Sequence, residues 1–173
     1  MIIEQIYTGC LSQGAYYIES NGEAAIIDPL REVDQYILKS KKNKASIKYI
    51  FETHFHADFV SGHLTLSKKT NAPIIYGPNA TPSFESIIAY DNQVFSIGDV
   101  TIKVIHTPGH TLESTCYLLS DENQNPYCLF SGDTLFLGDV GRPDLAQKSL
   151  NISKEDLAGI LFDSIHNKIS VLP

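Results

Sequence analysis

The sequence predicts one domain of the mixed α/β class. Its 173 residues, 43% of them hydrophobic, are enough to bury one sizeable core and too few for a second full domain. Strand-like alternation of apolar and polar residues gives way repeatedly to helical spacing along the chain. Turn residues separate these segments, and no internal repeat interrupts them. Strands and helices are therefore expected to pack around a shared core.

The first half of the chain begins with a predicted β-hairpin. Residues 15–20 and 23–27 alternate in polarity, and Asn21-Gly22 between them suits the positive φ angles of a type I′ turn. Residues 33–42 carry apolar side chains at helical spacing and predict a helix. A strand over residues 47–51 and a short helix after His63 are expected to follow.

The second half is predicted to be richer in strands and to include a late helix. Strand candidates cover residues 73–76, 93–96, 100–105, 115–119 and 127–131. Apolar residues at helical spacing between Leu157 and Ile165 mark one face of a helix, which Ser153 is expected to cap. The final apolar run, residues 169–173, is predicted to enter another strand, so we expect the polypeptide to continue beyond it.

Charge and cysteine usage exclude some classes of partner. The formal net charge is −7, and Lys/Arg clusters beyond residues 39–44 are absent, which argues against nucleic acid or an anionic membrane. A basic leader and a run of about 18 apolar residues are also absent, so a cytoplasmic protein is expected. The three cysteines, Cys10, Cys116 and Cys128, lack paired spacing and are expected to be small buried side chains in a reducing compartment.

The strongest chemical signal is a segment directly after the strand predicted over residues 47–51. It reads Thr53-His54-Phe55-His56-Ala57-Asp58-Phe59. Functional side chains collect on loops of this kind, which a rigid scaffold positions. Imidazoles and a carboxylate at alternate positions suit a borderline divalent metal, with some side chains as ligands and others orienting them. The segment therefore predicts a metal site, with a polar surface turn as the alternative.

Two further groups follow other predicted strands in the same way. They are Thr107-Pro108-Gly109-His110-Thr111 and Ser131-Gly132-Asp133-Thr134. Proline and glycine before His110 favour a tight turn that presents the imidazole, and Gly132 allows the backbone to pass close to a buried ion. Three strand ends are thus expected to converge on one metal.

The motifs THFHAD, TPGHT and SGDTLF, in this order over nearly the whole chain, resemble the metallo-β-lactamase superfamily. Within it, HADFVSGH from His56 to His63 and GDTLFLGDVGRPDLA from Gly132 to Ala146 look like the persulfide dioxygenases, especially bacterial ones fused to rhodanese domains. The resemblance implies an αβ/βα sandwich, two mixed sheets with helices outside. Residues 1–173 are expected to form most of this domain, incomplete at its C-terminus and followed by rhodanese domains.

The resemblance also implies which residues bind the metal. Two-metal hydrolases of the superfamily, such as glyoxalase II, have a histidine directly after the aspartate of the motif, whereas this chain has Phe59. One metal ion per chain is therefore expected, bound by His54, His110 and Asp133. Two histidines and one carboxylate are typical of non-haem Fe(II) oxygenases, so Fe(II) is the predicted cofactor and zinc the alternative.

The activity implied by the resemblance is that of a persulfide dioxygenase. Such an enzyme oxidises a low-molecular-weight thiol persulfide with O2 to sulfite and free thiol, and so detoxifies sulfide. His56 and Asp58 are candidate catalytic residues that either ligate the metal or orient its ligands. Arg142 is a candidate for binding the anionic substrate, with an ion pair to Asp144 as the alternative.

The sequence leaves two alternative functions open. One is a zinc-dependent, glyoxalase II-like thioester hydrolase using metal-activated water, against which Phe59 argues. The other is a noncatalytic metal-bearing module of a sulfur-transfer protein, against which the intact set of candidate ligands argues. The expected partners are the small-molecule substrates and further copies of the chain in a homo-oligomer, with no nucleic acid and no membrane.

Overall fold

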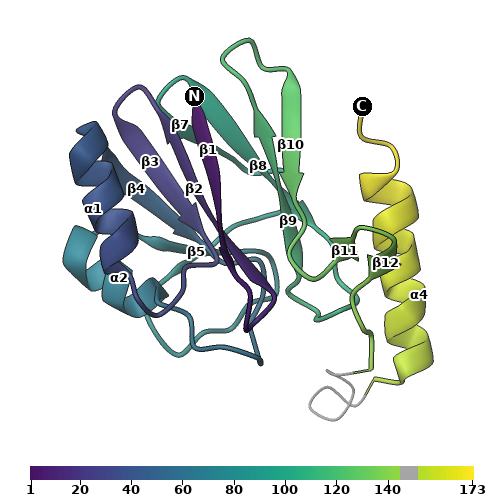
Figure 1. Ribbon diagram of the computed structural model, residues 1–173. Helices are drawn as coiled ribbons and strands as arrows, with labels where there is room; N and C mark the ends of the chain where they lie inside the picture. Colours follow the sequence, from purple (N-terminus) through teal and green to yellow (C-terminus); the bar gives the residue numbers. More distant parts are fainter. Residues whose placement is uncertain (145–151) are drawn as a thin grey trace.

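The computed structural model describes residues 1–144 and 152–173, and Figure 1 shows two β-sheets facing each other with helices outside them. The larger sheet has six strands in the order β1-β2-β3-β4-β5-β6, and the smaller has four in the order β10-β9-β8-β7. A separate hairpin pairs β11 with β12. This architecture confirms the predicted mixed α/β class and the αβ/βα sandwich.

The larger sheet combines an antiparallel half with a parallel half. The antiparallel strands are β1 (Ile2–Thr8), β2 (Gln13–Ser20) and β3 (Glu23–Ile27). The parallel strands that follow are β4 (Ser46–Phe51), β5 (Ile74–Tyr76) and β6 (Ile87–Ile88). Asn21 and Gly22 both have positive φ at the turn between β2 and β3, which confirms the predicted hairpin. The helices α1 (Asp34–Asn43) and α2 (His63–Thr70) connect the parallel strands and lie on the outer face of this sheet (Figure 1).

The smaller sheet is antiparallel throughout. Its strands are β7 (Val94–Ile97), β8 (Val100–His106), β9 (Thr115–Ser120) and β10 (Pro126–Phe130). The short hairpin that follows consists of β11 (Leu135–Phe136) and β12 (Asp139–Val140). The helix α4 (Lys154–Ser164), capped by Ser153 as predicted, continues into the π-helix η1 (Ile165–Ile169) on the side away from the larger sheet (Figure 1). None of the helices in residues 1–144 and 152–173 has the length and apolar character needed to cross a membrane.

Apolar side chains fill the space between the two sheets and the layer under each group of helices. Phe51 and Ile75 of the larger sheet pack against Ile102 and Tyr117 of the smaller one in the central core. A second core lies between the larger sheet and α1 and α2, where Tyr36 is fully buried. Because side chains alternate across a strand, one strand supplies two layers. The loops that carry the predicted metal ligands therefore project from a well-packed sandwich.

The predicted strand over residues 169–173 is wrong. Ile169 ends the π-helix η1, and Leu172 follows in a turn. Both side chains pack against a small core on the outer face of the smaller sheet that includes Ile105 and Cys116. Ile169 and Leu172, the two apolar residues of this run that pack, are three positions apart, a spacing that also suits one side of a helical turn, whereas Val171 is exposed.

The cysteines differ in their surroundings. Cys116 is buried and Cys128 half-buried, and burial raises the pKa of each thiol to about 11. Cys10 is exposed, so the expectation that it is a buried side chain is wrong. It lies in the loop between β1 and β2, where Leu11 is exposed as well.

Candidate metal centre

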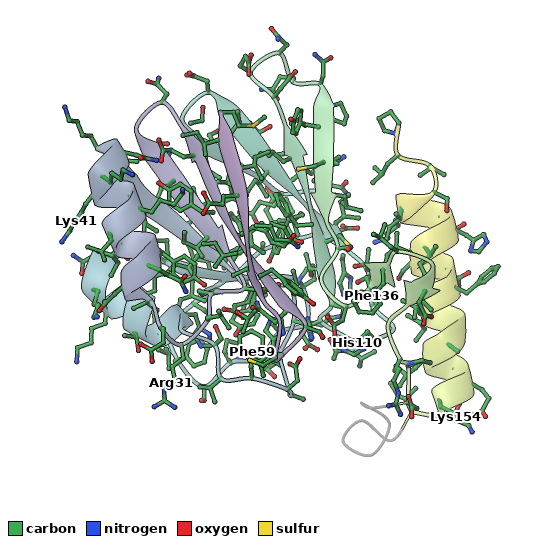
Figure 2. The ribbon with its side chains drawn as sticks, viewed as in Figure 1. Arg31, Lys41, Phe59, His110, Phe136 and Lys154 are labelled. Carbon is green, nitrogen blue, oxygen red and sulfur yellow. The ribbon has the colours of Figure 1, made fainter. Side chains whose placement is uncertain are left out.

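Three loops at the ends of strands bring the predicted ligands together. His54 follows β4, His110 lies between β8 and β9, and Asp133 follows β10. One ligand atom from each residue lies within 4.8 Å of the other two. His110 Nε2 is 3.6 Å and His54 Nε2 is 3.9 Å from Asp133 Oδ2. The labelled His110 lies beyond the lower ends of the strands in Figure 2, which places the cluster at an open edge of the sandwich.

Both histidines are held so that Nε2 points into the cluster. His54 Nδ1 lies 3.0 Å from Thr53 Oγ1, and His110 Nδ1 lies 3.0 Å from the carbonyl oxygen of Arg142. In the tautomer that protonates Nδ1, each ring donates to its neighbour and keeps the Nε2 lone pair for a cation. Metal-ligating histidines almost always donate their other N–H in this way. The residues present therefore fit one divalent metal ion.

The pKa values of His54 and Asp133 reflect the surroundings of the cluster. His54 is only 3% exposed, and burial is the main cause that lowers the pKa of its imidazole to about 3. The ring is therefore neutral, as a metal ligand must be. Burial also raises the pKa of the Asp133 carboxyl, against the attraction of His110. A bound cation would favour the charged form of this carboxylate, whose side chain is 40% exposed.

A second cluster, which the sequence analysis missed, supports the first. Asp28 Oδ1 accepts the backbone N–H of Thr53 at 2.7 Å, and Asp28 Oδ2 accepts the Thr53 hydroxyl at 2.8 Å. His56 Nε2 lies 3.0 Å from Asp28 Oδ1 and 3.6 Å from Glu52 Oε2. Burial disfavours the charged form of His56, but the Asp28 carboxylate raises its pKa to about 9. Asp28 follows the apolar strand β3 as His54 follows β4, and this position was the signal that could have identified it.

The remaining candidates lie around the cluster. Asp58 is exposed and lies on the wall of the adjacent cavity, together with His56 and Asp133. The Arg142 guanidinium, 70% exposed, donates to both oxygens of Asp144 at 3.1 and 2.7 Å. The structure thus contains the ion pair that was the alternative for Arg142, whose backbone carbonyl is the part that contacts His110. Leu145 and Ala146, the end of the second resemblance motif, lie outside the described residues.

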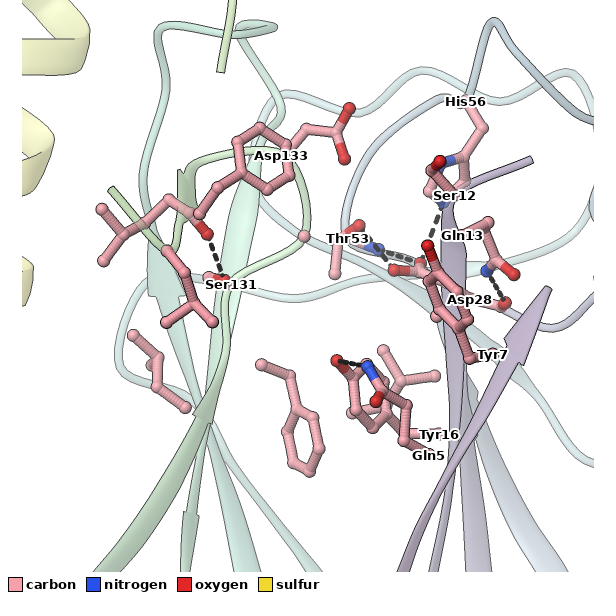
Figure 3. Close-up of a pocket in the computed structure, with 18 of the residues that line it drawn as sticks. Gln5, Tyr7, Ser12, Gln13, Tyr16, Asp28, Thr53, His56, Ser131 and Asp133 are labelled. Atoms are coloured by element: carbon pink, nitrogen blue, oxygen red, sulfur yellow. Dashed lines mark hydrogen bonds and ion pairs between the residues drawn. The ribbon is translucent and has the colours of Figure 1, made fainter. Parts of the chain in front are cut away.

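A cavity of about 570 Å³ opens beside the cluster (Figure 3). One wall comes from β1, β2 and the loop between them, including Tyr7 and Gln13, and the other from the segment after β10, including Ser131 and Leu137. Gln5 donates to the Tyr16 hydroxyl at 2.9 Å across its floor, away from Asp133. The cavity therefore offers amide, hydroxyl and apolar surface next to the metal-binding residues.

Two glycines make the close packing of the cluster possible. Gly132 has φ +49°, and a Cβ there would lie 2.6 Å from Thr53 Oγ1. The close neighbour that requires glycine at this position is Thr53, the residue that supports His54. At Gly141, a Cβ would lie 1.7 Å from the carbonyl oxygen of Asp133. The glycine backbone thus contacts the Thr53 side chain at Gly132 and the Asp133 backbone at Gly141, next to two of the ligands.

The fold and the cluster define a metal-binding domain with an αβ/βα sandwich architecture. The sequence profile of the metallo-beta-lactamase superfamily matches residues 8–170, and the chain belongs to this superfamily. The recognition made from the sequence motifs is confirmed at this level.

Known proteins of this superfamily resemble the chain over most of its length. A probable hydroxyacylglutathione hydrolase from Schizosaccharomyces pombe is 37% identical over 79% of this chain and 54% of its own length. A metallo-beta-lactamase structure from Staphylococcus aureus is 38% identical, with a TM-score of 0.89 over 100% of this chain and 53% of that one. The structure of ETHE1 from Myxococcus xanthus is 27% identical, with a TM-score of 0.84 over 100% of this chain and 72% of that one. The chain spans about half the length of the curated relatives it matches.

The predicted persulfide dioxygenase activity is contradicted by these relatives. Seven further matches, 30–35% identical, carry the same name of hydroxyacylglutathione hydrolase. The prediction of an oxidoreductase was therefore wrong. Its physical basis was Phe59, which removes one ligand of a second metal but leaves the cluster of His54, His110 and Asp133 intact. Catalytic zinc sites commonly hold one metal through three protein ligands, so this loss does not exclude hydrolysis.

Proposed function

We propose that this chain carries the metal centre of a hydrolase that cleaves thioesters of a low-molecular-weight thiol. The observation that carries the proposal is the cluster of His54, His110 and Asp133 in a chain whose curated relatives are named hydroxyacylglutathione hydrolases. A hydroxyacyl group on the sulfur of glutathione is a thioester. Because the chain spans about half the length of these relatives, the activity is proposed for the complete polypeptide.

The proposed cofactor is one zinc ion per chain. His54, His110 and Asp133 would hold it, and catalytic zinc sites commonly use three protein ligands of these types. A metal bound there lowers the pKa of water and polarises a carbonyl group. Fe(II), predicted together with the dioxygenase, suits the same ligand types and is the alternative that metal analysis tests.

Other residues are proposed to orient the metal ligands, to accept a proton and to bind the substrate. Thr53 and the Arg142 carbonyl orient the two ligand imidazoles, and Asp28 holds His56 beside them. Asp58, exposed on the cavity wall, is proposed to accept the proton of the attacking water. The thiol portion of the substrate is proposed to lie in the cavity toward Gln13, whose buried Oε1 has no hydrogen-bond partner among the described residues.

Replacing Asp58 by asparagine is expected to lower kcat about 10²–10⁴-fold, because a general base typically contributes this much. The metal content of Asp58→Asn is expected to match that of the wild type, since the side chain is not a member of the ligand cluster. Metal analysis and steady-state kinetics on the same samples make the comparison. Asp163→Asn is the control, because Asp163 is also an exposed carboxylate but lies on α4. This variant is expected to keep the kcat and the metal content of the wild type. An unchanged kcat in Asp58→Asn removes the residue from the mechanism.

The experiment that tests the function joins metal analysis to turnover. The complete polypeptide is purified, its metal content is measured, and it is assayed with a hydroxyacyl-glutathione thioester. About one zinc per chain is expected, with hydrolysis that a chelator abolishes and added zinc restores. Metal-loaded protein without hydrolysis of thioesters would support the noncatalytic alternative. Iron with O2 uptake on adding a thiol persulfide would overturn the hydrolase proposal.

Other expectations about the complete protein stay predictions. They are substrate binding by Arg142, assembly into a homo-oligomer, fusion to rhodanese domains and a cytoplasmic location. Arg142 forms an ion pair with Asp144, and its carbonyl oxygen contacts His110. These contacts support a role for Arg142 in holding His110 in place at least as well as a role in substrate binding.

A further inference from the structure

One face of the C-terminal helical segment contacts the loop that carries His110. Leu161 packs against Gly109, where a Cβ would lie 2.4 Å from the Leu161 Cβ. Ser164 Oγ donates to the carbonyl oxygen of Pro108 at 2.7 Å. The three contacting helical residues, Leu161, Ser164 and Lys168, are three and four positions apart, so they share one helical face. They meet the loop in antiparallel order.

Lys168 makes the outermost of these contacts and fixes both polar backbone groups of His106. Its ammonium donates to the His106 carbonyl oxygen at 2.7 Å and pairs with Asp91 Oδ2 at 2.8 Å. Asp91 Oδ1 in turn accepts the backbone N–H of His106 at 2.8 Å. His106, the last residue of β8 before the loop, is therefore held from the helix and from the segment before β7.

The loop has little freedom to move away from these contacts. Leu161 and Ser164 are 3% and 4% exposed, so their contacts with Gly109 and Pro108 are buried. Gly109 has φ +141°, a conformation that side chains rarely adopt, and it allows the loop to approach the helix backbone. Lys168 lies in the π-helix η1, and π-helical turns inserted next to α-helices frequently occur at functional sites.

We infer that Ser164 and Lys168 are positioning residues for the metal ligand His110. Neither side chain belongs to the ligand cluster, yet each fixes a carbonyl group two or four residues before the imidazole. This inference rests on the metal centre of the proposed function. Metal sites bind tightly when groups around the ligands hold them in place, and loss of such a group typically weakens binding about 10–100-fold.

Metal titrations on five single variants test the inference. Lys168→Met and Ser164→Ala remove the two contacts. Lys48→Met is a matched control, because Lys48 pairs with Glu23 at 2.7 Å with side-chain exposures of 34% and 34%, against 34% and 37% for Lys168 and Asp91. Ser40→Ala matches Ser164→Ala, since Ser40 is 5% exposed and donates to a backbone carbonyl in α1.

Dissociation constants for Zn²⁺, from chelator competition, and the visible spectrum of Co²⁺-loaded protein are the readouts. Lys168→Met and Ser164→Ala are each expected to bind Zn²⁺ about 10-fold more weakly and to change the Co²⁺ bands, with Lys168→Arg restoring both. The controls are expected to bind as the wild type does. Equal affinity in all variants, or equal loss in the controls, overturns the inference. A wild type that binds neither ion overturns the metal centre itself.

Discussion

Replacing His110 by alanine is expected to eliminate stoichiometric metal binding and, with it, hydrolysis. His110 supplies one of the three ligand atoms of the cluster, and its ring stands nearly perpendicular to that of His54, with ring centroids 5.0 Å apart. Removing it leaves one imidazole and one carboxylate, too few for the three-ligand sites that hold catalytic zinc. We expect the affinity for Zn²⁺ to fall by more than about 100-fold, beyond the loss typical for residues that only orient a ligand.

Metal content after dialysis and kcat/KM with a thioester measure this effect. His166→Ala is the matched control, because this exposed histidine stacks on Phe162 with ring centroids 3.8 Å apart and is not a member of the cluster. Its metal content and activity are expected to equal those of the wild type. Full metal occupancy in His110→Ala would assign the site to other residues.

Replacing Gly141 by alanine is expected to have the second largest effect, on both stability and metal binding. A Cβ at this position would lie 1.7 Å from the Asp133 carbonyl oxygen and 3.0 Å from the His110 Cβ. The new methyl group must push apart the two loops that carry these ligands. Overpacking of this kind typically costs about 1–3 kcal/mol, and we expect Zn²⁺ affinity to fall at least about 10-fold as the ligands separate.

Urea unfolding of the metal-free protein and Zn²⁺ titration separate the two effects of Gly141→Ala. Gly159→Ala serves as the opposite case, since no atom lies within 4 Å of a Cβ built there, in the helix α4. Alanine is expected to stabilise that helix by about 0.5–1 kcal/mol and to leave metal binding unchanged. If both variants behave alike, the contact between the loops does not hold the site together.

The strands and helices with strong periodic patterns could be predicted from sequence, whereas the weakly patterned ones could not. The hairpin at Asn21-Gly22 was predictable because few residues adopt positive φ at both turn positions. The edge strand β1 lacks apolar alternation, and its pairing with β2 depends on a partner that the local sequence does not specify. The two-residue strands β6, β11 and β12 are likewise defined by their neighbours.

The three ligand candidates could be predicted because each follows a recognisable strand and has metal-ligating chemistry. The position of Asp28 after a strand was a weaker signal, and Glu52 was not identified either, since a single acidic residue beside a strand is common on protein surfaces. Their role depends on burial, and both are nearly inaccessible in the fold, at 4% and 1% exposure. The contact between Lys168 and His106 could not be predicted from sequence either, because 62 residues separate the two.

The reaction was the least predictable property. Phe59 reports on a second metal position, and its ring packs against His56 with ring centroids 4.4 Å apart. The prediction of oxidation rested on this difference together with the resemblance of the motifs that begin at His56 and Gly132 to the persulfide dioxygenases. One bound metal with open positions serves either chemistry, so the ligand set alone does not decide between them.

The origin of the ligands on different sheets has a consequence for the whole molecule. His54 comes from the larger sheet, whereas His110 and Asp133 come from the smaller one. A metal ion bound by all three residues would connect the two sheets at one edge. Such an ion would bind the folded chain only. At a free metal concentration 100 times the dissociation constant, such binding adds about 2.7 kcal/mol to the free energy of unfolding. The free energy of unfolding would thereby depend on the concentration of free metal.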